Sequence, residues 1–393
     1  MSVNQYDAAL YQAAYDFITP FFDYGLKNPS VDTSDTIVFH NVVRDFIQSF
    51  PYFNAEQDLL SQIEPILRHV CLDPSFGVIE FGSILPPPKE SGSETESKIN
   101  QLRRRMAYSS PFFLDFLNRF THDDAPEKDL FLEKKFVFLI GNEASVSRFA
   151  ALQRAADQAN VTVVPAIFVS ACPYYSQINK NRTPEEDSER SQKLADSLIQ
   201  ETGSYPILYI SGYSGILGED QRQREACLDN TCRFATKIAY RMLKLADTSG
   251  LSRKEDQAQL LKKLAERGVI GSKIGFHFHY NSKTSLTENL TRLSGLIYQA
   301  IQEGVRVFDG NSFHGGQKNP LLGTGGPVPL SGNLMFQHIV AILAALQLPC
   351  GRLKTKEDYV DAVYRCEYVQ RQLYPKWVQP PPEDIFKAVI SGF

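Results

Sequence analysis

The 393-residue sequence contains no run of apolar residues close to the ~20 that a membrane-spanning helix needs. It also lacks a concentration of basic residues: Lys and Arg total 41 against 45 acidic residues, they are scattered along the chain, and the formal net charge is −4. Proteins that bind nucleic acid or an anionic membrane surface usually carry a basic patch. We therefore expect no nucleic acid and no membrane among its partners.

Signals for secretion are missing too. The first residues, MSVNQYDAALYQAAYDF, place acids and amides where a signal peptide has a basic start and an apolar core. Six cysteines at irregular spacings include no CxxC pair and no paired metal-ligand pattern, which is typical of reduced, buried thiols. We expect a cytoplasmic protein without a disulfide framework.

Eight short runs of β-branched and aromatic residues are present, and longer polar segments with helical periodicity lie between them. The runs are TIVFHNVV from Thr36, FGVIEFGS from Phe76, KFVFLIGN from Lys135, VTVVPAIFVS from Val161, YPILYIS from Tyr205, MLKLADTSG from Met242, KIGFHFHYN from Lys273 and VRVFDG from Val305. Alternating units of this kind predict an α/β protein folded as a closed (β/α)8 TIM barrel.

Helical patterns extend beyond the barrel at both ends. We expect a helical N-terminal extension over residues 1–35, a TIM-barrel catalytic domain over residues 36–350 and C-terminal helices over residues 351–393. The long connection after the second run predicts a loop insertion over about residues 84–134, with a helix through FFLDFLNRF. Both ends are expected to pack on the barrel or on a partner subunit of a homo-oligomer, most simply a dimer.

The seventh run carries two histidines on one face. Its strand period of two puts His277 and His279 on the side of Gly275, while the large apolar residues take the other side. Reacting groups of a (β/α)8 barrel stand at the carboxyl ends of its strands. A lone histidine is more often a core residue bonded to backbone, but a same-face pair at a strand end favours metal ligation.

Two other runs carry charged residues at the same end. The first closes in VVRD, where Asp45 can give a carboxylate to the metal and Arg44 a positive charge to a developing oxyanion, although a plain salt bridge fits as well. In the second run, Glu80 stands between apolar residues and needs a partner, because burial of an unpaired charge is costly. Arg44, on the neighbouring strand, is the obvious candidate.

Two further polar residues follow later runs. The sixth run closes with Asp247, which fits either a catalytic base or a cap of the helix that starts just after Ser252. The eighth run leads into FHGGQKNPLLGTGGPVPLSGN, whose glycines fit a mobile covering loop or ordinary turns. Asn333 ends this segment, and its amide oxygen can join a metal shell if the loop folds back over the barrel mouth.

These motifs resemble the HMG-CoA lyase-like, or DRE-TIM metallolyase, superfamily, whose barrels make or break carbon–carbon bonds through an enolate with the help of a divalent metal. The resemblance runs from about Thr36 to Leu373 and is carried by VVRD, VIEFGS, INKNRTPEEDSER, LADTSG, HFH and SGN. The superfamily includes isopropylmalate and homocitrate synthases. HMG-CoA lyases, with comparable VIETTSF, LGDTIG and SGNL segments, are its most similar branch.

The resemblance implies a role for each candidate residue. The implied ligands of a divalent cation are Asp45, His277, His279 and Asn333. Arg44 would hold the substrate carbonyl or enolate oxygen, Glu80 would orient Arg44, and Asp247 would assist proton transfer. An oxygen-rich shell of this composition favours Mg²⁺ or Mn²⁺ over Zn²⁺.

The sequence departs from the family pattern at several points. Phe46 stands where the family's RDG motif has glycine, and Tyr280 stands where an acid usually follows HxH. The lyase loop signature GGCPY has no counterpart, because Gly315-Gly316 is followed by Gln317 and Gly325-Gly326 by Pro327. The cysteine that takes part in the lyase's proton transfer is therefore absent.

Three residues are candidates to replace that cysteine: Asp247, Tyr280 and His314. We favour His314, because it precedes two glycines of the covering loop and a histidine titrates near neutral pH. An exposed loop histidine without a function fits the same position. If His314 is the donor, activity on HMG-CoA itself is expected to be weak or absent.

The expected function is that of a metal-dependent carbon–carbon lyase or aldolase acting on a 3-hydroxyacyl-CoA or a 2-oxo acid. Alternatives are a Claisen condensing synthase of the isopropylmalate or homocitrate type and a descendant that binds a ligand without catalysis. A metal-dependent hydrolase is disfavoured, because amidohydrolase-type barrels carry HxH at the first strand, where this sequence has Arg-Asp.

Overall fold

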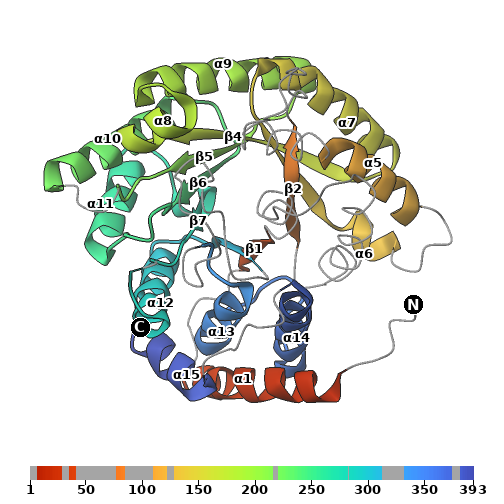
Figure 1. Cartoon of the computed structure of the whole chain (residues 1–393), viewed down its shortest axis with the longest axis vertical. Coiled ribbons are helices and arrows are strands. Elements are labelled where there is room, and N and C mark those ends of the chain that lie inside the picture. Colours follow the sequence, from red (N-terminus) through yellow and green to blue (C-terminus); the bar gives the residue numbers. More distant parts are fainter. Residues whose placement is uncertain are drawn as a thin grey trace, which may run out of the picture.

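The computed structural model describes residues 7–28, 35–40, 77–84, 109–121, 128–215, 220–281, 283–311, 332–373 and 381–393. Within these ranges, eight parallel strands close into a barrel in sequence order, with helices around it (Figure 1). The strands are β1 (Ile37–His40), β2 (Val78–Ile84), β3 (Lys135–Ile140), β4 (Thr162–Ser170), β5 (Ile207–Ser211), β6 (Met242–Ala246), β7 (Ile274–His277) and β8 (Val307–Gly310). The predicted (β/α)8 TIM barrel is confirmed.

Each of the eight strand runs contains one strand of the barrel, and β3, β6 and β7 end before their runs do. β1 is described as far as His40, since residues 41–76 lie outside the described ranges. β7 ends at His277, which is the last residue of this strand that pairs with β6. Phe278 instead accepts a hydrogen bond from the N–H of Leu334, in a segment that returns to the barrel mouth.

The outer helices begin and end where local sequence signals place them. The helices between α1 and α14 are α5 (Ser109–Phe120), α6 (Lys128–Leu132), α7 (Val146–Gln158), α8 (Pro173–Lys180), α9 (Pro184–Thr202), α10 (Gln221–Lys237), α11 (Lys254–Ala265), α12 (Leu286–Gln302) and α13 (Phe336–Leu346). In α9, Thr183 and Glu186 form a capping box, Pro184 occupies the first turn, and Gly203 ends the helix with φ of 70°.

Helices from both ends of the chain cover one side of the barrel. α1 (Ala8–Lys27) packs against α13 and α14 (Lys356–Leu373), and α15 (Pro382–Ile390) packs against α12 and α1 (Figure 1). All residues of α13 are buried, since α1 and α14 pack against it. The expected N- and C-terminal helices are confirmed, and they pack on their own barrel; the domain boundaries remain predictions.

The strands separate two sets of apolar side chains. The barrel interior contains a cluster of eight buried residues: Phe39, Val78, Val137, Val164, Ala166, Ile207, Tyr209 and Val307. Alternate positions, such as Leu208 and Ile210 on β5, belong to the larger core between strands and helices. At the carboxyl ends the inward positions become polar, as in Ser170 and Ser211, whose hydroxyls are 3.1 Å apart. The barrel therefore has an apolar interior and a polar mouth.

The described residues also bear on the state of the cysteines and on membrane-spanning helices. The cysteines among them, Cys172, Cys227, Cys232, Cys350 and Cys366, are all buried free thiols. No helix in the described ranges combines the length and the hydrophobicity needed to span a bilayer.

An aromatic cluster joins α5 to β2 and β3. The ring of Phe113 is fully buried, with its centroid 4.9 Å from that of Phe81 and 5.0 Å from those of Phe136 and Phe138. Edge-to-face contacts at such distances add to the free energy of burial. This cluster fixes α5, which lies in the long connection after β2, against the barrel wall.

Truncation of this ring is expected to destabilise the fold. Phe113→Ala should lower the free energy of unfolding by about 3–5 kcal/mol, because it leaves a cavity that the neighbouring rings cannot fill. Leu26→Ala is a suitable control, since Leu26 is 60% exposed and should change stability by less than about 0.5 kcal/mol. Urea denaturation of both variants measures the difference, and equal stabilities would contradict the importance of the cluster.

Candidate active site

The sequence-predicted site residues divide into two groups. Glu80, Asp247, His277, His279 and Asn333 lie in the described ranges. Arg44, Asp45 and His314 lie outside the described residues, so their assigned roles remain predictions.

Two neighbouring imidazoles mark the carboxyl end of β7. The ring centroids of His277 and His279 are 4.9 Å apart, and the ring planes meet at 66°. Phe276 and Phe278, the alternate residues, stack in the outer core with centroids 5.0 Å apart. The two faces of this strand end are therefore divided as the alternation predicts, with imidazoles on one and large apolar groups on the other.

Asn333 lies opposite His279. The two residues form an antiparallel bridge, in which the N–H of Tyr280 donates to Gly332 O and the N–H of Leu334 donates to Phe278 O, each at 2.9 Å. Residues opposed in this pattern do not bond each other through their backbones, and their side chains approach more closely than in the alternative pairing. The structure thus places Asn333 directly across from His279, with the two side chains on the same face of the bridge.

The returning segment is also tied to β8. The N–H of Asn311 donates to Leu334 O at 3.0 Å, and the N–H of Phe336 donates to Asn311 O at 2.8 Å. Residues 332–336 are therefore held between the ends of β7 and β8, and the position of Asn333 is set by backbone bonds on both sides.

Two charged residues that the sequence analysis missed lie beside His277 in the barrel interior. Oδ2 of Asp309, on β8, lies 2.9 Å from Nδ1 of His277, and the Asp309 carboxylate forms an ion pair with Lys244 of β6. The side chains of Lys244 and Asp309 are fully buried. The sequence signal was a charged residue within an apolar run, MLKLA, or near the end of one, VRVFDG, but only the closed barrel shows that both positions are inward.

Glu80 is fully buried in β2. Its neighbours Ile79 and Phe81 belong to the outer core, so the alternation turns Glu80 toward the barrel interior. The pairing of β2 with β3 shifts register between Glu80 and Gly82, and such irregularities commonly re-aim a side chain near a site. The expected pairing of Glu80 with Arg44 remains a prediction.

Asp247 has a fully buried carboxylate that accepts hydrogen bonds from four donors. Oδ1 accepts from the hydroxyl of Ser214 at 2.6 Å and from the backbone N–H groups of Leu251 at 3.0 Å and Ser252 at 3.1 Å. Oδ2 accepts from Arg292 at 3.0 Å. These contacts hold the turn before α11, whose N-cap is Arg253, so the Asp247 carboxylate stabilises this turn rather than capping the helix. Its role in proton transfer stays a prediction.

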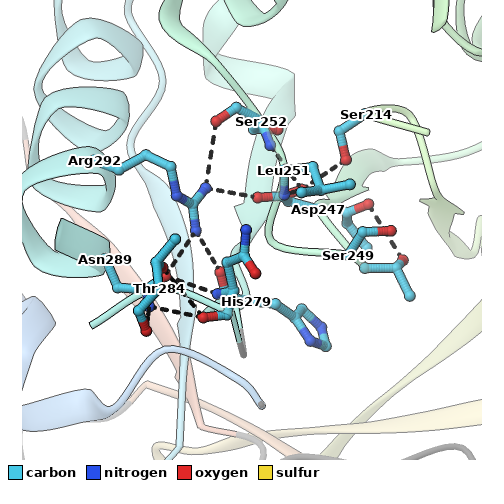
Figure 2. A network of polar contacts seen from close by, with 12 residues as sticks. Ser214, Asp247, Ser249, Leu251, Ser252, His279, Thr284, Asn289 and Arg292 are labelled. Atoms are coloured by element: carbon cyan, nitrogen blue, oxygen red, sulfur yellow. Dashed lines mark hydrogen bonds and ion pairs between the residues drawn. The ribbon is translucent and has the colours of Figure 1, made fainter. Parts of the chain in front are cut away.

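Arg292 of α12 connects this turn with the end of β7. Besides Asp247, its guanidinium donates to the carbonyl oxygen of His279 at 2.7 Å and to that of Ser252 at 3.4 Å. Figure 2 shows Arg292 between the two loops, with the His279 ring extending away from the guanidinium. Arg292 thus fixes the backbone that carries His279.

Tyr280 does not face the candidate site. Its hydroxyl lies 2.6 Å from Nδ1 of His338 and accepts from the N–H of Met335 at 3.0 Å, within the outer core. Burial raises the pKa of Tyr280 far above its ordinary value, and the Met335 N–H offsets this only in part. Tyr280 is therefore a poor candidate for the missing proton donor.

Removal of the Arg292 guanidinium is expected to destabilise this region. Arg292→Met should lower the free energy of unfolding by about 1.5–3 kcal/mol, because it removes a charged partner from the buried Asp247. Arg233→Met is the matched control: Arg233 pairs with Glu185, both are more than 40% exposed, and the expected loss is below ~1 kcal/mol. Equal losses in a denaturation experiment would show that Arg292 has no special structural role.

Solved structures of HMG-CoA lyases share this fold. The lyase from Bacillus subtilis is 17% identical over 91% of this chain and 99% of that chain, with a TM-score of 0.59. The Brucella melitensis lyase is 16% identical over 86% and 100%, with a TM-score of 0.58, and the Pseudomonas aeruginosa lyase is 18% identical over 91% and 98%, with a TM-score of 0.57. No family model and no curated protein matches the sequence. The chain therefore has the barrel fold of these lyases.

Proposed function

We propose that this protein is a divalent-metal-dependent carbon–carbon lyase or aldolase of the HMG-CoA lyase type, acting through an enolate on a 3-hydroxyacyl-CoA or a 2-oxo acid. The observation that carries the proposal is the gathering of His277, His279 and Asn333 at the carboxyl end of a barrel with the fold of HMG-CoA lyases. This is the end of a (β/α)8 barrel at which chemistry takes place.

The donor groups suit a divalent cation. Two neighbouring imidazoles lie here, Asn333 is bridged to His279, and the sequence motif VVRD would add Asp45 as the fourth ligand. Within the described ranges no group of three His, Cys, Asp or Glu residues is arranged so that it could hold a metal ion, so the proposed set depends on the amide of Asn333 and on Asp45. Mg²⁺ or Mn²⁺ suits this mixture better than Zn²⁺. The cation, when bound, would supply Lewis-acid polarisation of substrate oxygens.

The chain's own residues would perform the remaining steps. Arg44 would donate hydrogen bonds to the substrate oxygen on which negative charge develops, and Glu80 would orient its guanidinium. His314 would deliver the proton to the carbon released by cleavage. Asp247 would act as a positioning residue, since its carboxylate and Arg292 hold the backbone beside His279.

The first prediction of this proposal concerns metal binding. The purified protein should bind one divalent cation per chain, and His277→Ala or His279→Ala should lose it on dialysis, because each removes a direct ligand. His338→Gln is the control, since His338 contacts Tyr280 in the outer core and should leave the metal content unchanged. Elemental analysis after dialysis measures the stoichiometry. Full metal content in both alanine variants would exclude the assigned ligands.

The second prediction concerns substrate. Metal-loaded protein should cleave at least one member of a panel of 3-hydroxyacyl-CoAs and 2-oxo acids, with weak or no activity on HMG-CoA because the GGCPY cysteine is absent. Arg44→Lys should reduce kcat by ~10²–10³-fold, since the fork of donors is lost. Vigorous cleavage of HMG-CoA would overturn the substrate claim. A metal-loaded protein inert on the whole panel would favour the non-catalytic alternative.

The third prediction concerns the proton donor. His314→Ala should reduce kcat by ~10²–10⁴-fold on the preferred substrate while leaving metal content unchanged. A substitution confined to the alternative candidate, Tyr280→Phe, should leave kcat within a few-fold, because that hydroxyl bonds His338 and Met335 in the outer core. Unchanged turnover in the His314 variant would refute the donor assignment.

A further inference from the structure

A buried charge pair lies in the barrel interior beside His277. Lys244 on β6 lies at the level of Gly275 on β7, and Asp309 stands on β8. Gly275 has no side chain, and a Cβ at that position would come within 2.9 Å of Val307. The Lys244 ammonium forms an ion pair with the Asp309 carboxylate across β7, the strand between β6 and β8.

Among the described residues, two aromatic rings flank the Lys244 ammonium. The Lys244 ammonium lies 3.2 Å from the ring centroid of Phe39 and 5.1 Å from that of Tyr209, and both rings belong to the interior cluster. A buried ion pair in such surroundings is seldom a source of net stability, since two apolar side chains of similar volume would serve as well. Packing alone does not account for a charge pair here.

The ionisation state of Asp309 follows from its contacts. The Asp309 carboxylate forms an ion pair with the Lys244 ammonium, and both side chains are fully buried, so the carboxylate is the charged partner of a buried cation. An ionised carboxylate can only accept hydrogen bonds. Nδ1 of His277, 2.9 Å from Asp309 Oδ2, must therefore be the donor.

We propose that Asp309, charged by its pairing with Lys244, is a positioning residue that fixes the tautomer and ring orientation of His277. With the proton on Nδ1, the neutral ring carries its lone pair on Nε2, at the side opposite Asp309. A carboxylate behind a ligating histidine is a common way to orient such a ligand and to raise its basicity. The consequence for metal affinity rests on the proposed function; the tautomer of His277 does not.

The Lys180–Asp187 pair shows what a structural ion pair of the same type does in this protein. The Asp187 carboxylate is buried, accepts from the N–H of Ser170 at 2.9 Å and pairs with Lys180 at 2.7 Å. Lys180 also donates to the carbonyl oxygen of Phe168 at 2.6 Å. The Lys180–Asp187 pair binds backbone groups of β4, whereas Asp309 binds the imidazole of His277. Substitutions in the Lys180–Asp187 pair are therefore a matched control for substitutions in the Lys244–Asp309 pair.

The first arm of the test uses the metal-free wild-type protein. ¹⁵N NMR with labelled histidine, assigned with a His277→Gln variant, should show His277 as a single tautomer protonated on Nδ1. The Nε2–H tautomer, or rapid exchange between the two, would overturn the proposal. This arm needs neither metal nor activity. If the wild-type protein then binds no Mn²⁺, the proposed function is wrong, but the NMR result still tests whether Asp309 fixes the tautomer of His277.

The second arm replaces each pair with apolar side chains. Lys244→Met with Asp309→Leu should abolish the single Nδ1–H tautomer and weaken Mn²⁺ binding by ~10–100-fold in calorimetric titration. Lys180→Met with Asp187→Leu should retain both the tautomer and the affinity. A folded Lys244/Asp309 double variant with wild-type tautomer and affinity would contradict the proposal. If that variant does not fold, the wild-type tautomer alone decides.

Discussion

In a closed eight-stranded barrel, every second residue of each strand points into an interior that side chains fill, and this constraint determines where charge can reside. Most inward positions of the described strands are apolar, among them Phe39, Tyr209 and Val307. Lys244 and Asp309 are charged inward residues deep in the interior, and each is the other's partner. Because burial of charge in the barrel interior is costly, a charged residue that is found there indicates a role other than packing.

The mouth of the barrel is held by contacts between segments far apart in the sequence. Arg292 joins the turn after β6 to the carbonyl of His279, and backbone bonds hold residues 332–336 between β7 and β8. These contacts fix the backbone that carries His279 and Asn333 at the barrel mouth. A preorganised backbone of this kind lets side chains serve a ligand.

The sequence patterns predict the barrel and the outer helices well because those signals are local. The strand period of two assigns His277 and His279 to one face, and the capping box of Thr183 and Glu186 places the start of α9. The role of Asp247 was left open because its partners Ser214 and Arg292 are 33 and 45 residues away. The buried position of Lys244 was not predicted, because a lysine that alternates with leucines is also typical of a half-exposed strand. Only the closure of the barrel places the Lys244 face of β6 in the interior.

We infer that the imidazole pair and the Asn333 amide form one metal site, in which Asp309 holds the His277 ring from the side opposite the metal. Anomalous diffraction from crystals soaked in Mn²⁺ can locate such a site. We expect a single strong peak at bonding distance from Nε2 of His277, from His279 and from the amide oxygen of Asn333, with Nδ1 of His277 still bonded to Asp309. A peak elsewhere on the chain, or one bonded to Nδ1 of His277, would contradict it.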